Sequence, residues 1–455
     1  MPKKKTALTI EERLQQALVP AEEQPYEVPE NWVWVRLENV ASWGSGGTPS
    51  RKHEEYYNGD ILWIKTGELN NGWIYDTEEK ITDEGLQKST AKLFPPYSVL
   101  IAMYGATIGK VAILGVPATT NQACACAVCN QSLLYMYLFY YCISQKNVFI
   151  EKGKGGAQPN ISQIILKQHP IPLPPLSEQQ RIVERIEELF AKLDEAKERL
   201  QEVADSFAVR KAAILHKAFT GELTKQWRRE NGVSDESWEE KKLGEVGSWL
   251  GGGTPSTSRE EYWENGNILW ITSKDMKSAV IEDTLMKVNE VGVKNSSANY
   301  IEKPALLVVM RSGILRRTFP VAMVKKPFTV NQDLKAIIPD KDDLEFLYWM
   351  LLSNEQHILN TCMKNGTTVE SINSNALKDL TFKCPTLPEQ HEIVRLIDDL
   401  LARERAAQQA TEQALASIDL MKKAILARAF RGELGTNKAS EASALELLRQ
   451  VLAEN

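Results

Sequence analysis

Long apolar stretches are missing from this chain of 455 residues. No run approaches the roughly 20 apolar residues that a helix needs to cross a bilayer. The opening segment Met1–Lys5 is basic, but the apolar stretch of a signal peptide does not follow it. The sequence therefore predicts a cytoplasmic protein without contact to a membrane.

Cysteine is scarce, and 6 residues in a chain of this length do not indicate a disulfide framework. Cys124, Cys126 and Cys129 lie close together, but they stand in an apolar, strand-like run without a histidine nearby. We expect these cysteines to be core residues, and no metal site is predicted.

A surplus of positive charge is also lacking, because 54 lysines and arginines stand against 60 aspartates and glutamates, for a net charge of −6. This balance excludes a surface coated in positive charge for nucleic acid, although a local basic face remains compatible with it. Residues 184–205 carry much of the acid. Their carboxylates are either the solvated side of a helix or a surface for partner subunits.

What the chain does contain is a long internal repeat. Trp32–Ser50 returns as Trp238–Ser256, and Glu178–Leu223 returns as Glu389–Leu434. Each copy runs from a globular block into a long helical segment. A chain built as two such units predicts a two-fold arrangement.

The spacing between the two copies varies in the globular blocks and is constant in the helical segments. Trp238 follows Trp32 by 206 residues, Asn331 follows Asn121 by 210, and residues 166–223 precede their counterparts by a constant 211. A helix of constant length beside globular blocks of varying length indicates that the helix acts as a ruler, which sets a fixed distance. A short, well-packed coiled coil would also resist insertions.

Heptad spacing of apolar residues predicts a coiled-coil seam in the first helical segment. Its members are Ile182, Ile186, Leu189, Leu193, Ala196, Leu200, Val203, Phe207, Ile214 and Ala218. Ser177 and Gln180 have the form of a capping box at its start, and Gly221, matched by Gly432, marks its end.

The second helical segment has a poorer seam. Its members are Ile393, Ile397, Leu400, Glu404, Ala407, Thr411, Ala414 and Ile418. Glu404 and Thr411 replace Leu193 and Leu200 of the first seam, either to fix the register or, for Glu404, as a side chain at the edge of the seam. We expect the two segments to pair as an antiparallel coiled coil that relates the halves by a pseudo-dyad.

Each globular block has the pattern of a mixed α/β domain with many short strands. Residues 133–143 and 344–352 are expected to be helical. The predicted strands are 61–64, 99–103 and 111–114 in the first block and 268–271, 306–310 and 321–324 in the second.

The loops that follow matched strands differ between the copies. Tyr104–Lys110 stands where Arg311–Arg317 stands, and Lys65–Glu68 stands where Thr272–Asp275 stands. Arg and Lys can bind guanine edges, and short polar side chains can bind bases or phosphates. Matched strands that carry different loops favour two domains that recognise two different nucleic-acid sequences. Ordinary divergence after duplication would also produce such loops.

Catalytic motifs are weak. Phe94–Tyr97 (FPPY) resembles the D/N/S-P-P-Y/F motif of amino-methyltransferases, but Phe94 replaces the polar residue that must accept the amine hydrogen. Gly105–Val111 lacks the length and the Ser/Thr of a phosphate-binding loop. The sequence predicts a chain without a catalytic site and without a cofactor.

Taken together, the ordered motifs of both copies resemble the specificity subunits of type I restriction-modification enzymes, over nearly the whole chain. The matching segments are the G-G-T-P-S runs 46–50 and 252–256, the G-A-T-I-G-K loop 105–110, the Asn-Gln pairs 121–122 and 331–332, the helix start 387–394, and the A-F-x-G-E-L runs 218–223 and 429–434.

The resemblance implies an α+β fold of two similar α/β target recognition domains, separated by two long helices that pair as an antiparallel coiled coil with pseudo-two-fold symmetry. The expected divisions are 1–28 (N-terminal segment), 29–175 (target recognition domain 1), 176–225 (central helical spacer), 226–386 (target recognition domain 2), 387–435 (C-terminal helical spacer) and 436–455 (C-terminal tail). One departure is Cys384–Gln390 (CPTLPEQ) at the entry to the second helix, where the first helix has Leu173–Gln179 (LPPLSEQ).

The resemblance also implies that each domain reads one half of a split site in double-stranded DNA. Two modification subunits would dock on the helices and methylate adenine N6, and restriction subunits would add ATP-driven translocation and cleavage. The expected DNA-binding residues are Thr48, Ser50, Lys65, Tyr104, Thr107, Lys110, Lys154, Thr254, Ser256, Ser273, Lys274, Arg311, Arg316, Arg317 and Lys364.

The alternative function is a coiled-coil scaffold protein that reads no DNA. It would explain the seams, but not two elaborate α/β blocks with basic loop tips. At the N-terminus we expect a short helix, residues 10–18, with disorder on either side.

Overall fold

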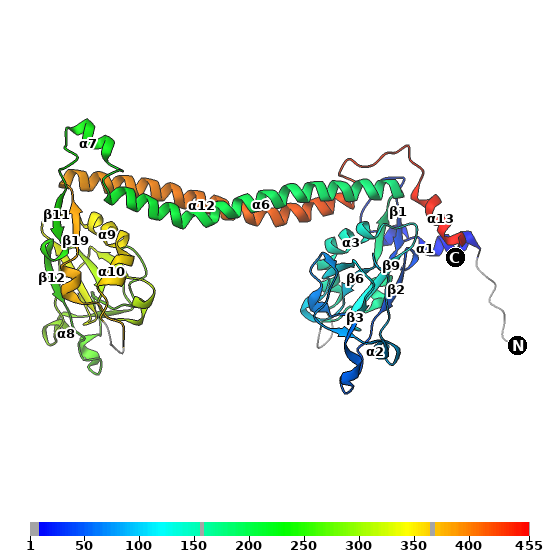
Figure 1. Cartoon of the computed structure of the whole chain (residues 1–455), viewed down its shortest axis with the longest axis horizontal. Coiled ribbons are helices and arrows are strands. Elements are labelled where there is room, and N and C mark those ends of the chain that lie inside the picture. Colours follow the sequence, from blue (N-terminus) through cyan, green and yellow to red (C-terminus); the bar gives the residue numbers. More distant parts are fainter. Residues whose placement is uncertain (1–8, 155–158, 365–368, 455) are drawn as a thin grey trace. The chain divides into compact units, whose positions relative to one another are not determined.

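The computed structural model describes residues 9–154, 159–364 and 369–454, and the chain divides into two compact units. Unit 1 consists of residues 1–200 and 414–455, and unit 2 consists of residues 201–413. Each unit therefore joins one globular block to a part of both long helices (Figure 1).

Unit 1 is built on three sheets of short strands. A five-stranded sheet has the order β2-β9-β6-β7-β4, a three-stranded sheet has the order β5-β3-β8, and β1 pairs antiparallel with β10. The strands are β1 (Val33–Arg36), β2 (Ala41–Ser45), β3 (Tyr57–Ile64), β4 (Trp73–Ile74), β5 (Lys80–Ile81), β6 (Val99–Ala102), β7 (Val111–Leu114), β8 (Thr119–Thr120), β9 (Cys124–Cys129) and β10 (Pro170–Leu173).

The helices of unit 1 are short, apart from the two that it shares with unit 2. They are α1 (Ile10–Ala17), α2 (Asp83–Gln87), α3 (Tyr135–Ser144), α4 (Lys146–Lys152), α5 (Gln163–Lys167) and α13 (Ala444–Glu454), with single 3-10 turns at Ala21–Glu23, Leu37–Asn39, Glu54–Tyr56, Thr66–Glu68 and Gly105–Thr107.

Unit 2 repeats this topology. Its four-stranded sheet has the order β12-β18-β15-β16, a second sheet has the order β14-β13-β17, and β11 pairs antiparallel with β19. Where unit 1 has β4, unit 2 has a single parallel bridge from Val280 to Met323. The strands are β11 (Glu239–Lys242), β12 (Gly247–Gly251), β13 (Ile268–Ile271), β14 (Met286–Val288), β15 (Ala305–Val309), β16 (Val321–Val324), β17 (Phe328–Val330), β18 (Leu334–Pro339) and β19 (Thr381–Cys384).

The short helices of unit 2 are α7 (Lys225–Asn231), α8 (Glu290–Lys294), α9 (Leu344–Ser353), α10 (Glu355–Thr361) and α11 (Ser374–Lys378), with 3-10 turns at Leu243–Glu245, Glu260–Tyr262 and Gly313–Arg316. Four of them, α8 to α11, follow the order of α2 to α5 in unit 1, whereas α1 and α13 belong to unit 1 alone among the helices that the structure describes. The strands and the helices α3 and α9 that the sequence predicts are thereby confirmed.

The main sheet of unit 1 is buried on both faces. Along β6, Val99 and Ile101 face the large core that holds α3, while Leu100 and Ala102 face a second, smaller core. This alternation follows from the two-residue period of a strand. Cys124 and Cys126 lie fully buried in the smaller core, as expected for structural cysteines.

The two long helices are α6 (Leu176–Phe219) and α12 (Leu387–Ala429), of 44 and 43 residues. In unit 1, Ile186 of α6 and Leu426 of α12 share one core, and Asp194 pairs with Lys422 at 2.5 Å. In unit 2, Leu215 and Ile397 share one core, and Arg210 pairs with Glu404 at 2.9 Å. Within each unit the paired residue numbers run in opposite directions, so the expected antiparallel pairing is confirmed.

Parts of the predicted seam are wrong in detail. Val203 is 40% exposed, and Ala407 is exposed as well, so neither is a buried seam residue. Glu404 lies at the seam edge with Arg210 as its partner, whereas Thr411 is buried and donates its hydroxyl hydrogen to the carbonyl of Ala407. Each of these two polar seam residues therefore makes a hydrogen bond within its unit.

The ends of the long helices are defined by backbone geometry. The predicted capping box is wrong, because α6 begins at Leu176 and the Ser177 hydroxyl instead donates to Glu441 at 3.1 Å. The predicted glycine ends are confirmed, since Gly221 and Gly432 have φ values of +80° and +75°.

The first turns of the two helices match in spite of the different sequence before α12. The side-chain amide of Gln179 donates to the carbonyl of Pro174, and that of Gln390 donates to the carbonyl of Pro385, both at 3.0 Å.

The N-terminal helix is confirmed as α1, which packs against α13. The disorder expected after it is wrong, because the Val19 amide donates to the Trp34 carbonyl at 2.9 Å. Residues 1–8, for which disorder was also expected, lie outside the described residues. Among the helices that the structure describes, none is both long and apolar enough for a transmembrane segment.

Candidate nucleic-acid interface

The same glycine loop follows β2 in unit 1 and β12 in unit 2. A Cβ atom on Gly46 would lie 1.7 Å from the Thr120 carbonyl oxygen, and one on Gly252 would lie 1.8 Å from that of Val330. Only glycine permits this close approach. The loop is thereby fixed against the strand that leads into the Asn-Gln turn of each unit.

The predicted site residues Thr48 and Thr254 lie on these loops with exposed side chains. Thr48 donates its hydroxyl hydrogen to Gln122 at 2.5 Å, and Thr254 donates to Gln332 at 2.8 Å. Two residues further on, Ser50 and Ser256 are exposed as well.

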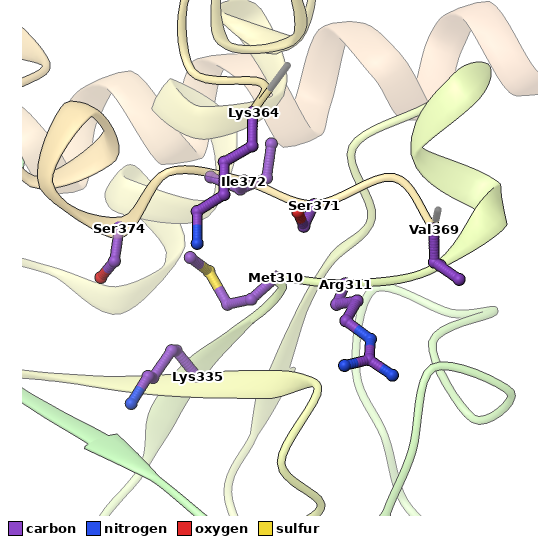
Figure 2. A pocket seen from close by; sticks show the side chains of 8 residues that line it. All are labelled: Met310, Arg311, Lys335, Lys364, Val369, Ser371, Ile372 and Ser374. Carbon is purple, nitrogen blue, oxygen red and sulfur yellow. The ribbon is translucent and has the colours of Figure 1, made fainter. Parts of the chain in front are cut away.

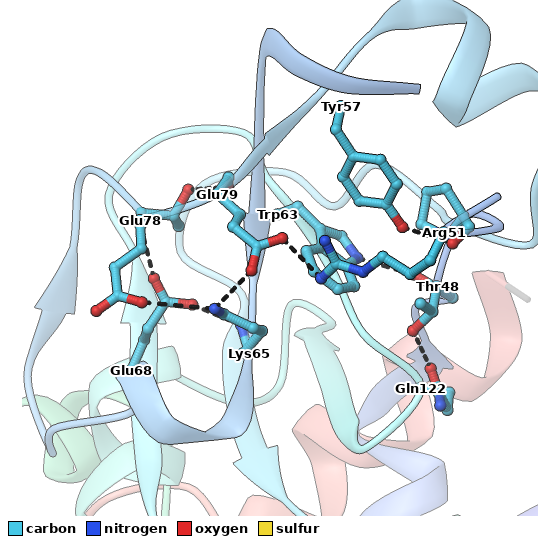
Figure 3. Close-up of polar contacts among 12 residues, drawn as sticks. Thr48, Arg51, Tyr57, Trp63, Lys65, Glu68, Glu78, Glu79 and Gln122 are labelled. Atoms are coloured by element: carbon cyan, nitrogen blue, oxygen red, sulfur yellow. Dashed lines mark hydrogen bonds and ion pairs between the residues drawn. The ribbon is translucent and has the colours of Figure 1, made fainter. Parts of the chain in front are cut away.

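Lys65 is already engaged by carboxylates. Its ammonium lies 2.9 Å from Glu79 and 3.4 Å from Glu78, as Figure 3 shows. The hydrogen bond to Glu79 raises the pKa of Lys65, and the same bond lowers the pKa of Glu79. Lys65 therefore remains charged, but its charge is offset within the protein. Its role as a DNA contact stays a prediction.

Arg51 belongs to the same cluster and was missed by the sequence reasoning. Its guanidinium lies 2.7 Å from Glu79 and 4.4 Å from the ring centre of Tyr57 (Figure 3). Arginine stacked on an aromatic ring loses little freedom when it binds phosphate. The residue follows the G-G-T-P-S run directly, which is the signal that could have identified it.

The loops after β6 and β15 share a single 3-10 turn but differ in charge. In unit 1, Tyr104 is 41% exposed, Thr107 donates to its carbonyl at 2.8 Å, and Lys110 follows the turn. In unit 2, Arg316 pairs with Glu370, whereas Arg317 is exposed without an ion pair to any residue that the structure describes.

A basic cleft lies beside this loop in unit 2. It has a volume of about 490 Å³, and Figure 2 shows the side chains of Arg311, Lys335 and Lys364 around it. Arg311 is 63% exposed in its side chain, and its nearest carboxylate oxygen, on Asp333, is 3.6 Å away. The cleft thus gathers three cations with little compensation by carboxylates. We call these eight lining residues the basic cleft: Met310, Arg311, Lys335, Lys364, Val369, Ser371, Ile372 and Ser374.

The equivalent place in unit 1 is much less basic. By the repeat offsets, Tyr104 replaces Arg311 and Ala125 replaces Lys335, and the remaining cation, Lys154, pairs with Glu151 at 2.6 Å. Lys335 was missed because a lysine in a strand of the sheet gives no loop signal. Its partner in the register is Val308 of β15, which places it beside the Arg311 loop.

The remaining predicted residues, Ser273 and Lys274, lie on the turn after β13. The backbone amide of Lys274 donates to the Thr272 hydroxyl at 3.2 Å, and its side chain is exposed. Phe94, the residue that weakens the methyltransferase motif, is buried under Gly44 in the smaller core of unit 1.

The sequence matches the family described as Type I restriction modification DNA specificity domain over residues 29–205 and 235–415. The specificity subunit of the type I restriction enzyme EcoR124I/EcoR124II from Escherichia coli is 40% identical over 159 residues, which are 35% of this chain and 39% of that protein. That of EcoKI from Escherichia coli strain K12 is 24% identical over 458 residues, which cover 94% of this chain and 96% of that protein.

Among solved structures, the HsdS subunit from Thermoanaerobacter tengcongensis has a TM-score of 0.65 at 20% identity, and the match covers 90% of this chain and 99% of that one. This likeness concerns the fold. The chain belongs to the type I restriction-modification DNA specificity family. The resemblance drawn from the paired motifs is therefore confirmed, as is the interpretation of the chain as a DNA specificity subunit rather than a coiled-coil scaffold.

Proposed function

We propose that this chain directs a type I restriction-modification complex to a split site in double-stranded DNA. The domain at residues 29–175 reads one half of the site and the domain at 226–386 reads the other. The helical spacers 176–225 and 387–435 set the gap between the halves. The chain itself supplies no catalytic step.

The partners in this proposal are two modification subunits, which dock on the helices and methylate adenine N6, and restriction subunits, which add ATP-driven translocation and cleavage. The exposed acidic residues of α6, such as Glu195, Glu198 and Glu202, offer a surface for such partners. The expected absence of a catalytic site and of a cofactor in this chain belongs to the same proposal.

The observation that carries the proposal is one scaffold used twice with different polar tips. The strands that the main sheets of the two units share follow the same order, but unit 1 has a tyrosine and an alanine at the positions of two cations of the basic cleft in unit 2. Base edges in the major groove are read by such side chains, and phosphates are bound by lysine and arginine. Two domains that recognise two different half-sites need the same fold with different side chains on the loops that face the DNA.

The acidic composition of the chain is compatible with DNA binding, because positive charge is concentrated locally. A net charge of −6 describes the whole chain, whereas the side chains of Arg311, Lys335 and Lys364 meet at one cleft. Binding to DNA depends on the charges within about one Debye length of the phosphates, roughly 8 Å at physiological salt.

The test is modified-base sequencing of DNA from cells that express this chain together with its modification subunit, compared with cells that express the modification subunit alone. We expect N6-methyladenine only in the first case, at an asymmetric two-part motif with a fixed gap. Methylation that is absent, or independent of this chain although both proteins are expressed, would refute the proposed function.

A further inference from the structure

One exposed hydrogen bond occurs at the same place in both units. Thr48 bonds to Gln122 in unit 1, and Thr254 bonds to Gln332 in unit 2, while all four side chains are exposed. A hydrogen bond in solvent adds little to stability, because water offers the same partners. Its repetition therefore calls for a reason other than folding.

The backbone beneath the two pairs is built alike. The indole of Trp63 donates to the Gly47 carbonyl at 2.9 Å, and the indole of Trp270 donates to the Gly253 carbonyl at 3.1 Å. The other side of each pair is fixed too, because the Asn121 amide donates to Ile64 at 2.9 Å. In unit 2 the corresponding bond joins Asn331 to Ile271 at 3.0 Å. Each glutamine thus projects from a turn that is anchored to a buried strand.

The surrounding residues differ between the units while the pair is the same. Lys65 stands where unit 2 has Thr272, and Tyr104 stands where unit 2 has Arg311. Residues that differ can read bases that differ between the two half-sites. Residues that are identical and identically placed are suited to a feature that both half-sites share.

The chemistry of a held glutamine identifies that feature. The threonine hydroxyl occupies one lone pair of the amide oxygen, which leaves one lone pair and both N–H groups free. An acceptor beside a donor matches the N6–H and N7 of adenine in the major groove. Guanine presents two acceptors at that edge, so the same amide cannot pair with both of them. The threonine also limits the rotamers of the glutamine before DNA arrives, which lowers the entropy lost on binding.

We propose that Gln122 and Gln332 each recognise an adenine, one in each half of the DNA site, at equivalent positions of the two halves. This inference rests on the proposed function, because it assumes that each unit reads one half-site. It adds a base that both halves have in common and the side chain that reads it.

The experiment uses the complex of the full chain with its modification subunits and a duplex that contains the site found by sequencing. A series of duplexes replaces one base pair at a time, and competition binding at one fixed salt concentration compares wild type with Gln122→Ala and Gln332→Ala. Gln15→Ala, an exposed glutamine on α1, is the matched control. Gln122→Glu is a second variant, since its carboxylate can still accept from Thr48 but cannot donate to N7.

We expect each alanine variant to bind the intact site about 5- to 150-fold more weakly, the cost of one bidentate base contact. Each should lose discrimination at a single position of its own half-site, and that position should be an A·T pair in both halves. Gln122→Glu should behave as Gln122→Ala does, and Gln15→Ala should match wild type.

Four results would overturn the inference. They are a loss spread evenly over all duplexes, which indicates a phosphate contact; no loss; discrimination retained by Gln122→Glu; and different bases at the two positions. A wild-type complex without any sequence preference would instead refute the proposed function, so the two failures can be told apart.

Discussion

Arg311 and Lys65 carry the same charge at loop tips, but they differ in how far carboxylates of the protein already neutralise that charge. Lys65 has two carboxylates within 3.4 Å, whereas Arg311 has one, at 3.6 Å, and faces the basic cleft. A cation that is already paired must break its partner's bond before it can bind DNA. Arg311 is therefore the stronger candidate for direct readout.

Arg311→Ala tests this difference. We expect a loss of about 1–3 kcal/mol in binding free energy, confined to one position of the half-site that unit 2 reads, because a bidentate arginine contact to guanine is lost. Competition binding against single-base variants of the site measures it, with Arg229→Ala on α7 as the control. A loss of equal size on every sequence would identify a phosphate contact instead.

His169 shows how a single buried residue ties the stability of unit 1 to pH. It is 3% exposed, its Nδ1 lies 3.1 Å from the Lys152 ammonium, and burial lowers its pKa to about 3. The unfolded chain binds a proton near pH 6.5, whereas the folded chain does so only near pH 3. Stability is therefore present above pH 6.5 and is lost as the pH falls towards 3.

We expect the free energy of unfolding of unit 1 to fall by about 1 kcal/mol between pH 7 and pH 5.5 through this histidine. His169→Leu should remove that dependence, since Leu380 occupies the equivalent place in unit 2. Urea unfolding at the two pH values measures the effect, and His357→Gln, an exposed histidine on α10, should leave it unchanged. An unaltered pH dependence in His169→Leu would contradict the assignment.

At the level of elements, the sequence predicted the helices and strands well because periodicity reports burial directly. The wrong predictions concern residues for which a sequence rule predicted a local role but the packing of the chain gives them another. Ser177 had the form of a cap, but Arg181 and Ser177 together hold Glu441, so the serine hydroxyl is used elsewhere. Val203 kept the heptad spacing and is nevertheless 40% exposed, because a seven-residue repeat drifts relative to a helix of 3.6 residues per turn.

The ruler role of the helices predicts the result of an insertion. Four residues placed after Ala204 in α6 add about 6 Å of helix, or roughly two base pairs at 3.4 Å each. We expect modified-base sequencing to find both half-sites unchanged and a longer gap between them. Four residues inserted after Gly232, between α7 and β11, should leave the gap as it was. Altered half-sites with an unchanged gap would sink the ruler interpretation.

For the molecule as a whole, the repeat was the most informative feature of the sequence, because it gave both the number of units and the places where they differ. The composition of the site was harder to predict. Lys335 and Arg51 join their clusters through sheet register and aromatic stacking, which single-residue spacing does not reveal. Gln122 and Gln332 were visible as a repeated Asn-Gln pair, but their bonds to threonine depend on how the chain folds and could not be predicted from the spacing.

The way the two units divide the chain has a consequence for synthesis. Unit 2 is one continuous stretch, residues 201–413. Unit 1, in contrast, lacks the last part of α12 and the whole of α13 until residues 414–455 have been made. At about 5–20 residues per second, the 213 residues between Leu200 and Ala414 take roughly 10–40 s to translate. The unit that emerges first from the ribosome is therefore completed after the other one, because its core contains Leu426, Phe430 and Leu448, which are made after the whole of unit 2.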